Sequence, residues 1–339
     1  MNYKFGILVF SLIAVPLWFV VGKVQLTAFQ NSEFSFAPSF YGSEIKSQWS
    51  DQFQEVLMKS TSDGTLQAGY FFGSTSSIAQ PLVVSLHTWS GDYQQYDPLA
   101  EIVAYKNWNY IHPDFRGANL SQESCLGEKV VSDIDDAIRF AFNNGNVDEE
   151  NVIVIGQSGG GYVALGAYLR SSFTLKAVVA WNPISDLDSW YWESLVRNPV
   201  YSKNILQCTS KGVLLNSDVA KWRSPITWEV PPERRGKLEI YAGINDGHVG
   251  PVPISHSMTF YNKIVDHYGY KKKRISDERM NRLLVRTPLE KVFAKSIGGR
   301  KVYFEEDAGM ISIVIFEGDH EMLSDYSVER IHTLVTNSS

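Results

Sequence analysis

Residues 151–165 place a serine between a buried strand and a helix, and this arrangement constrains the fold more than any other feature of the chain. Residues 152–155 are all Val or Ile, which is typical of a strand that is buried on both faces. Residues 156–160 read Gly-Gln-Ser-Gly-Gly, and a helix starts after them. Glycines permit a sharp turn at this point, so the hydroxyl of Ser158 should be exposed just before a helix N-terminus that favours negative charge.

Two other kinds of glycine-rich turn have to be weighed against a nucleophilic serine. An ordinary strand–helix turn also tolerates glycine, and nucleotide-binding loops are built from it. The chain has no G-x-x-x-x-G-K-[ST] motif, and Ser158 stands where the second glycine of G-x-G-x-x-G would be. The pattern therefore favours a nucleophilic serine.

Composition excludes several classes of protein. A chain of 339 residues with 44% hydrophobic residues can bury one large core, and a net charge of −6 argues against a general nucleic-acid binder. Cys125 and Cys208 are too few for a disulfide scaffold and lack metal-site spacing. They pair if the protein is exported, or they are two separate buried thiols. No cluster of His, Cys or acidic residues has metal-ligand spacing, so we expect neither a metal nor a cofactor.

The N-terminus predicts export. Lys4 precedes an uncharged, mostly apolar run over residues 5–22, and Lys23 follows it. Residues 1–22 then form either a cleaved signal peptide or a retained membrane anchor, and the length of the run leaves both open. Residues 23–50 are expected to be a linker or arm, and residues 51–339 the folded domain. The protein is thus expected to be periplasmic or extracellular, secreted or held at a membrane.

Strands and helices alternate along the domain, which predicts an α/β fold with a mostly parallel sheet covered on both faces. Strands are expected at 53–60, 65–72, 81–87, 109–112, 152–155, 175–181, 237–242, 301–306 and 310–316. Helices are expected at 98–108, 130–142, after the Ser158 turn, at 253–268 and at 321–335.

Two insertions interrupt this alternation. Residues 185–231 are rich in aromatic side chains, which predicts either a pocket wall carried by Trp190, Tyr191 and Trp192 or a packed side lobe without substrate contact. Residues 269–300 should contain a helix capped by Ser276 and a second short helix opening at Thr287-Pro288. Eleven basic residues against three acidic ones between positions 271 and 301 indicate either a solvated basic face or a rim that attracts anions.

A serine nucleophile needs a base, and the base needs a carboxylate that orients it. In α/β-hydrolases these residues follow in the order Ser, Asp or Glu, His, each after the C-terminal end of a strand. Ser158, Asp246 and His320 meet that order and that placement. The other six of the seven histidines precede the serine, share the loop of the acid or fall within expected helices. The oxyanion should be bound by the backbone N–H of Gly159 and of Trp89.

The ordered set of motifs resembles the catalytic domain of prolyl-oligopeptidase-type α/β-hydrolases. The resemblance is carried by Thr-Ser-Asp-Gly-Thr at 61–65, Phe-Arg-Gly at 115–117, Asp133 before Ala-Ile at 137–138, Gly-x-x-Asp-x-x-Val at 243–249, and Gly-Asp-His at 318–320, together with the Ser158 turn. It implies an α/β-hydrolase fold and a serine hydrolase that works through an acyl-enzyme. The sequence departs from the family at His-Thr-Trp, residues 87–89, where His-Gly-Gly is usual, and we expect no propeller before the domain.

We therefore expect an exported serine hydrolase that cleaves a peptide or ester bond in an open cleft. A carboxylesterase or acetyl esterase acting on a small or sugar-borne ester is the alternative within the same chemistry. A catalytically silent, membrane-tethered binding protein is the alternative from another class, and the intact Ser/Asp/His set argues against it. The partners expected are a small ester or peptide substrate and no nucleic acid.

Overall fold

The computed structural model describes residues 48–210, 213–233, 236–287 and 295–336, which belong to a unit spanning Ser47–Ser339. The apolar run at residues 5–22 and the helix expected from Thr287-Pro288 onward lie outside the described residues. Among the helices described, none is both long and apolar enough to cross a bilayer.

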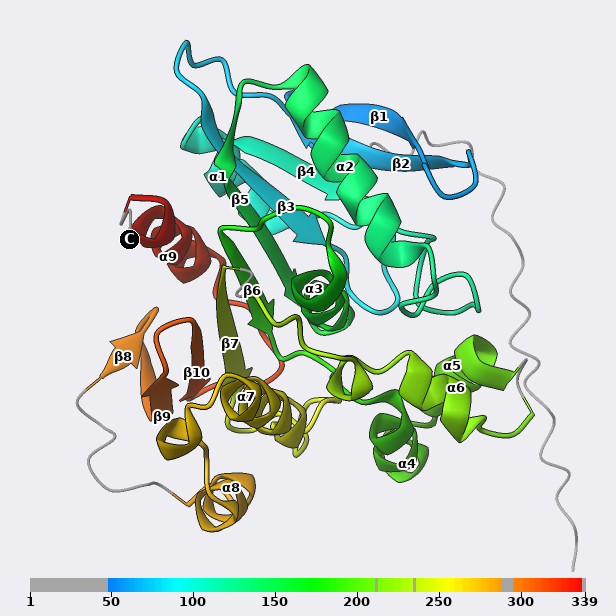
Figure 1. Cartoon of the computed structure of the whole chain (residues 1–339), viewed down its shortest axis with the longest axis vertical. Helices are drawn as coiled ribbons and strands as arrows, with labels where there is room; N and C mark the ends of the chain where they lie inside the picture. The colour runs from blue at the N-terminus through cyan, green and yellow to red at the C-terminus, as the bar shows by residue number, and fades with distance from the viewer. Residues whose placement is uncertain (1–47, 211–212, 234–235, 288–294, 337–339) are drawn as a thin grey trace, which may run out of the picture. The chain divides into compact units, whose positions relative to one another are not determined.

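Ten strands of the described residues form one sheet in the order β1-β2-β4-β3-β5-β6-β7-β10-β9-β8 (Figure 1). The strands are β1 (Gln54–Lys59), β2 (Leu66–Phe72), β3 (Gln80–Leu86), β4 (Asn109–Pro113), β5 (Val147–Gln157), β6 (Ala177–Trp181), β7 (Lys237–Gly243), β8 (Ser296–Ile297), β9 (Arg300–Asp307) and β10 (Ile311–Phe316). Neighbours from β4 to β10 run parallel, whereas β1, β2, β8 and β9 pair antiparallel at the two edges. The expected mostly parallel α/β sheet is confirmed.

Helices cover both faces of the sheet (Figure 1). They are α1 (Pro98–Tyr105), α2 (Val130–Asn144), α3 (Gly159–Arg170), α7 (Ser255–His267) and α9 (Ser324–Thr336). Successive residues of one strand join different cores: Val83 belongs to the core that holds residues of α1 and α9, and Val84 to the core that holds residues of α2, α3 and α7. This alternation follows from the two-residue period of a strand. It explains why the central strands read as continuous apolar runs.

Three of the motifs that carried the family resemblance meet at one ion network. The guanidinium of Arg116 binds the carboxylates of Asp63, at 2.8 Å, and of Asp133, and it donates to the hydroxyl of Ser60 at 2.9 Å. The hydrogen bond to Asp133, as the largest cause, and that to Asp63 raise the pKa of Arg116. The network holds the β1–β2 hairpin, the loop after β4 and helix α2 together.

Both insertions lie beside the loop that follows β7, at the carboxyl edge of the parallel strands. The first contains α4 (Leu187–Arg197), α5 (Pro199–Ser210), α6 (Ser217–Trp222) and the 3-10 turn η1 (Pro225–Thr227). The second contains the 3-10 turn η2 (Lys271–Lys273) and α8 (Asp277–Leu284), which Ser276 caps as expected. Arg197 of α4 donates to the carbonyl of Gly247, and the Nε2 atom of His248 lies 2.8 Å from the carbonyl oxygen of Leu284 in α8.

Many basic side chains of the second insertion pair with acids on neighbouring elements. Lys273 binds Glu306 at 2.8 Å, Lys295 binds Glu305 at 2.7 Å, and Arg274 binds Asp266 at 3.0 Å. Arg300 binds Glu321 at 3.1 Å. Paired cations attract a further anion less strongly, so these contacts favour the solvated basic face over an anion-attracting rim.

Candidate active site

Ser158 lies on a strained turn between β5 and α3. Its backbone adopts φ 58° and ψ −117°, a conformation that side-chain-bearing residues rarely take. A Cβ at Gly156 would overlap the backbone of Gly160, and a Cβ at Gly160 would overlap the carbonyl of Leu86. The glycines on both sides are therefore required by close backbone contact, and helix α3 starts at Gly159, earlier than its apolar residues suggested.

Asp246 and His320 come from the loops after β7 and β10, which are neighbouring parallel strands. Nδ1 of His320 lies 2.7 Å from Oδ2 of Asp246, whose side chain is buried. The other carboxylate oxygen accepts the N–H groups of Gly247 and Val252, each at 3.0 Å. Since both of these donors are backbone groups, the carboxylate is held at a fixed angle. The carboxylate accepts the hydrogen on Nδ1 of His320, so Nε2 of the neutral ring carries no hydrogen.

The loop of His320 is also tied to the turn that carries Ser158. The Nε2 amide of Gln157 donates to the carbonyl oxygen of His320 at 2.9 Å. A Cβ at Gly250 would overlap Asp246 and approach His320, so only glycine lets that loop close over the pair. The imidazole stays 17% exposed, which leaves it accessible to a small molecule.

The histidines that were excluded as the base from the sequence lie in other surroundings. His87 is buried and stacks on Phe115, with ring centroids 3.7 Å apart. His256 is buried, and its Nε2 lies 2.9 Å from Glu193. Burial lowers the pKa of His112 to about 4. Of the described histidines, His320 is the one whose ring is hydrogen-bonded to Asp246.

The two predicted oxyanion donors lie next to each other. A Cβ at Gly159 would overlap the backbone nitrogen and Cα of Trp89. Gly159 is also the first residue of α3, where N–H groups have no acceptor within the helix. The loop after β3 and the start of α3 are therefore in close backbone contact beside Ser158.

A model of the prolyl oligopeptidase family matches residues 96–278, which are 183 of the 339 residues of the chain. The chain belongs to the prolyl oligopeptidase family. It is therefore classed with the serine hydrolases, and the resemblance carried by its motifs is confirmed.

Solved structures of peptidases share its fold. An acylaminoacyl peptidase in complex with Z-Gly-Gly-Phe-chloromethyl ketone is 16% identical with a TM-score of 0.57, over 84% of this chain and 40% of the peptidase. A puromycin-hydrolyzing peptidase of Mycobacterium tuberculosis is 16% identical with a TM-score of 0.56, over 83% and 38%. Dipeptidyl peptidase 4 of Porphyromonas gingivalis is 17% identical with a TM-score of 0.54, over 84% and 35%.

A curated relative matches a shorter part of the chain. The uncharacterized protein YfhR of Salmonella typhi is 28% identical over 117 residues, which are 33% of this chain and 40% of that protein. The chain thus spans about two fifths, or less, of the length of each of these relatives.

In this prolyl oligopeptidase family member, the loop that carries Trp89 is held on both sides. The amide oxygen of Gln95 accepts the backbone N–H and the hydroxyl of Thr88, at 3.0 and 2.8 Å. The carbonyl oxygen of Trp89 accepts the N–H of Asn119 at 2.8 Å. These bonds restrict rotation of the peptide units next to the expected oxyanion donor.

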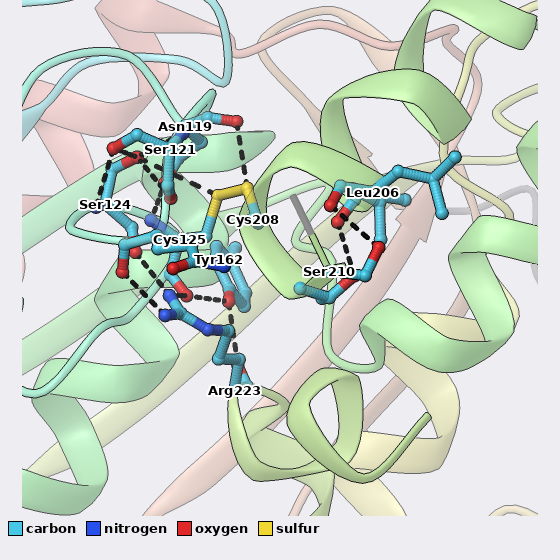
Figure 2. Close-up of a disulfide and its surroundings, with 12 residues drawn as sticks. Asn119, Ser121, Ser124, Cys125, Tyr162, Leu206, Cys208, Ser210 and Arg223 are labelled. Carbon is cyan, nitrogen blue, oxygen red and sulfur yellow. Dashed lines mark hydrogen bonds between the residues drawn. A yellow bond between two sulfur atoms is a disulfide. The ribbon is translucent and has the colours of Figure 1, made fainter. Parts of the chain in front are cut away.

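A disulfide joins Cys125 to Cys208 of α5 in the first insertion (Figure 2). Because Asn119 bonds both Cys125 and the carbonyl of Trp89, the disulfide links the neighbourhood of Trp89 to α5. The N–H of Cys125 donates to the side-chain oxygen of Asn119 at 2.9 Å. Arg223 donates to the carbonyl of Ser124 at 2.6 Å and to that of Cys125 at 3.1 Å. Sequence alone left the pairing open, because the two cysteines are 83 residues apart.

The aromatic residues of α4 divide into one buried and one exposed group. Trp190 is fully buried, which differs from the pocket wall expected for it, and Tyr191 is also buried. Trp192 is 59% exposed. The helix turns successive side chains by about 100°, so adjacent aromatics face different surroundings. Of the three, Trp192 has the surface that a substrate could contact.

Sequence reasoning missed Asn182, which lies buried after β6 and donates to Asp246. The available signal was its position: it follows a strand that lies between β5 and β7. Buried residues at that edge of the sheet are placed to touch the loops that carry Asp246 and His320.

Proposed function

We propose that the protein is an exported serine hydrolase that cleaves an acyl bond, most readily a peptide bond, through a covalent acyl-enzyme. The observation that carries the proposal is the 2.7 Å bond between His320 and Asp246 beside the strained turn of Ser158. Membership of the prolyl oligopeptidase family and the peptidases that share its fold support a peptide as substrate.

The proposed reaction begins with attack of the Ser158 hydroxyl oxygen on the carbonyl carbon. Nε2 of His320 takes the hydroxyl proton, and Asp246 stabilises the resulting imidazolium through Nδ1. The carbonyl oxygen becomes an oxyanion and is bound by the N–H groups of Gly159 and Trp89.

Collapse of this intermediate breaks the scissile bond and leaves the acyl group on Ser158. Nε2 of His320 donates its proton to the leaving amine or alcohol. A water molecule then attacks the acyl-enzyme with the same base, which releases the carboxylic acid and restores the serine.

Export is supported by two features. The apolar run at residues 5–22 follows a lysine, as in signal peptides and anchors. The Cys125–Cys208 disulfide suits an oxidising compartment. Mass spectrometry of the N-terminus of the mature protein, after cell fractionation, distinguishes cleavage behind residue 22 from a retained anchor. A full-length protein in the cytoplasmic fraction would contradict export.

A fluorophosphonate probe tests the nucleophile, because it reacts with activated serines. The wild-type protein should be labelled, and Ser158→Ala should not, with an unchanged unfolding temperature. Equal labelling of the variant would place the nucleophile elsewhere, and an unlabelled wild type would favour a silent binding protein. Aminoacyl-nitroanilides tested beside p-nitrophenyl esters then separate a peptidase from an esterase.

A further inference from the structure

The turn after β6 touches all three loops that carry the proposed triad. Strand β6 lies between β5 and β7 in the sheet. The carbonyl oxygen of Trp181 accepts the backbone N–H of Ser158 at 2.8 Å, and the N–H of Asn182 donates to the carbonyl of Tyr241 in β7 at 2.7 Å. The peptide unit between Trp181 and Asn182 therefore links the nucleophile's turn to the strand that leads to Asp246.

The side chain of Asn182 completes these links. Its Nδ2 atom lies 2.8 Å from Oδ2 of Asp246 and 3.2 Å from the carbonyl oxygen of Asp319, the residue before His320. Both partners are acceptors, so the amide nitrogen, and not the amide oxygen, must face them. One NH₂ group thus bridges the loop of the acid and the loop of the base.

Asn182 occupies this position at a local cost. Its φ angle is 47°, in the left-handed region, and its Oδ1 atom is buried without a hydrogen-bond partner in the described residues. Each of these features is unfavourable by itself. Their coincidence in a side chain that is 1% exposed indicates that the donor group is what the site requires.

We propose that Asn182 is a positioning residue that holds the carboxylate of Asp246 in the orientation that His320 needs. The proposal rests on the function proposed above. Oδ2 of Asp246 receives two hydrogen bonds, one from Asn182 and one from Nδ1 of His320. Without the amide donor, Oδ2 would keep only its bond to His320, so the carboxylate would be held less tightly on that side although its other oxygen keeps two backbone donors. The loop before His320 would also lose a contact. Substrate does not need to touch Asn182 for this effect.

The first test is Asn182→Gly, which removes the amide and retains a residue that readily adopts a positive φ. Glycine adopts this backbone conformation without strain, so a loss of activity in the variant could not be caused by a strained turn. We expect kcat to fall about ten- to a hundredfold, the range of one hydrogen bond to a charged group, with KM changed less than about twofold. Fluorophosphonate labelling should slow in parallel, while the unfolding temperature stays close to that of the wild type.

The second test is Asn182→Asp, which keeps the shape of the side chain and tolerance of the left-handed region. It places a second carboxyl group beside Asp246, and two carboxyl groups at this distance raise one of their pKa values. When the new carboxyl group is protonated, it can donate a hydrogen bond to Asp246. When it is ionised, its negative charge repels the carboxylate of Asp246. Of the titratable side chains in the described residues, Asp246 is bonded to this position and His320 is bonded to the same carboxylate oxygen. Asp319 contributes its carbonyl, and its side chain is exposed.

The ratio of kcat/KM for Asn182→Asp to that of the wild type should therefore fall as pH rises from about 6 to 9. A residue that only fills space would give a ratio that does not change with pH. That result, or a kcat of Asn182→Gly equal to that of the wild type, would overturn the proposal.

Asp246→Asn separates this proposal from the proposed function. If Asp246→Asn is inactive and Asn182→Gly is fully active, the triad stands and the positioning role fails. If Asp246→Asn is also fully active, the assignment of the acid itself is wrong.

Discussion

The ring of Trp190 meets the ring of Trp89 edge-on, with the centroids 4.8 Å apart and the planes at 77°. The Nε1–H of Trp190 also donates to the carbonyl oxygen of Pro251 at 3.0 Å. Trp89 carries a proposed oxyanion donor, and Pro251 belongs to the loop of Asp246. The first insertion therefore contacts two parts of the proposed site through one buried side chain.

Trp190→Ala should lower the stability of the fold and the turnover of every substrate. Loss of a fully buried indole costs about 3–5 kcal/mol, and Trp89 would lose its neighbour. Urea unfolding and kcat/KM for a set of acyl groups measure both effects.

Trp192→Ala is the matched control, because the same helix carries this ring at the surface. We expect a change in stability within about 0.5 kcal/mol and a change in selectivity among acyl groups. A stable Trp190→Ala variant with altered selectivity alone would show that Trp190 contacts substrate.

Asp246→Asn should reduce kcat by about 10³- to 10⁴-fold, since an amide can hold the imidazole in the wrong tautomer and does not stabilise its cation. The fold should be retained, as judged by circular dichroism. Asp319→Asn is the control, because this adjacent carboxylate is exposed and should tolerate the change. Equal losses in both variants would argue against a specific role for Asp246.

Replacing both Cys125 and Cys208 by Ser should lower stability by about 2–4 kcal/mol, because the bridge restricts the unfolded chain. It should also lower kcat several-fold, since Cys125 holds Asn119 and Asn119 holds Trp89. A reductant should reproduce both effects in the wild type and leave the double variant unchanged. A wild type whose unfolding temperature and kcat do not respond to full reduction would contradict this coupling.

His112 should make the fold less stable as the pH falls below about 6.5. Burial holds the pKa of this histidine at about 4 in the folded protein, against 6.5 for a free side chain. The unfolded chain thus binds the proton first, and stability is lost progressively from pH 6.5 to pH 4, by about 2 kcal/mol at pH 5. Urea unfolding at pH 7 and pH 5 measures the difference, which should shrink in His112→Phe. An equal difference in both proteins would assign the effect to other groups.

Much of the fold could be predicted because its signals are local. Apolar β-branched runs, helix caps and glycines at sharp turns act within a few residues, so they predicted the strands, α8 behind Ser276 and the turn of Ser158. The chain order of Ser158, Asp246 and His320 was also readable, because parallel strands bring their C-terminal ends to one edge of the sheet. The structure places Asp246 beside His320, and their catalytic roles stay predictions.

Long-range packing decided the rest. Pairing of Cys125 with Cys208 requires the loop near Trp89 and helix α5 to meet, and nothing near either cysteine encodes that contact. The burial of Trp190 depends on which side of α4 packs against Trp89 and against Tyr201 of α5. The contacts of Asn182 could not be predicted from the sequence, because its partners lie 64 and 137 residues away in the chain. They follow from the place of β6 between β5 and β7 in the sheet. The sequence by itself determined the order of the strands along the chain and the types of the reactive groups, and the tertiary structure determined which side chains hold them in place.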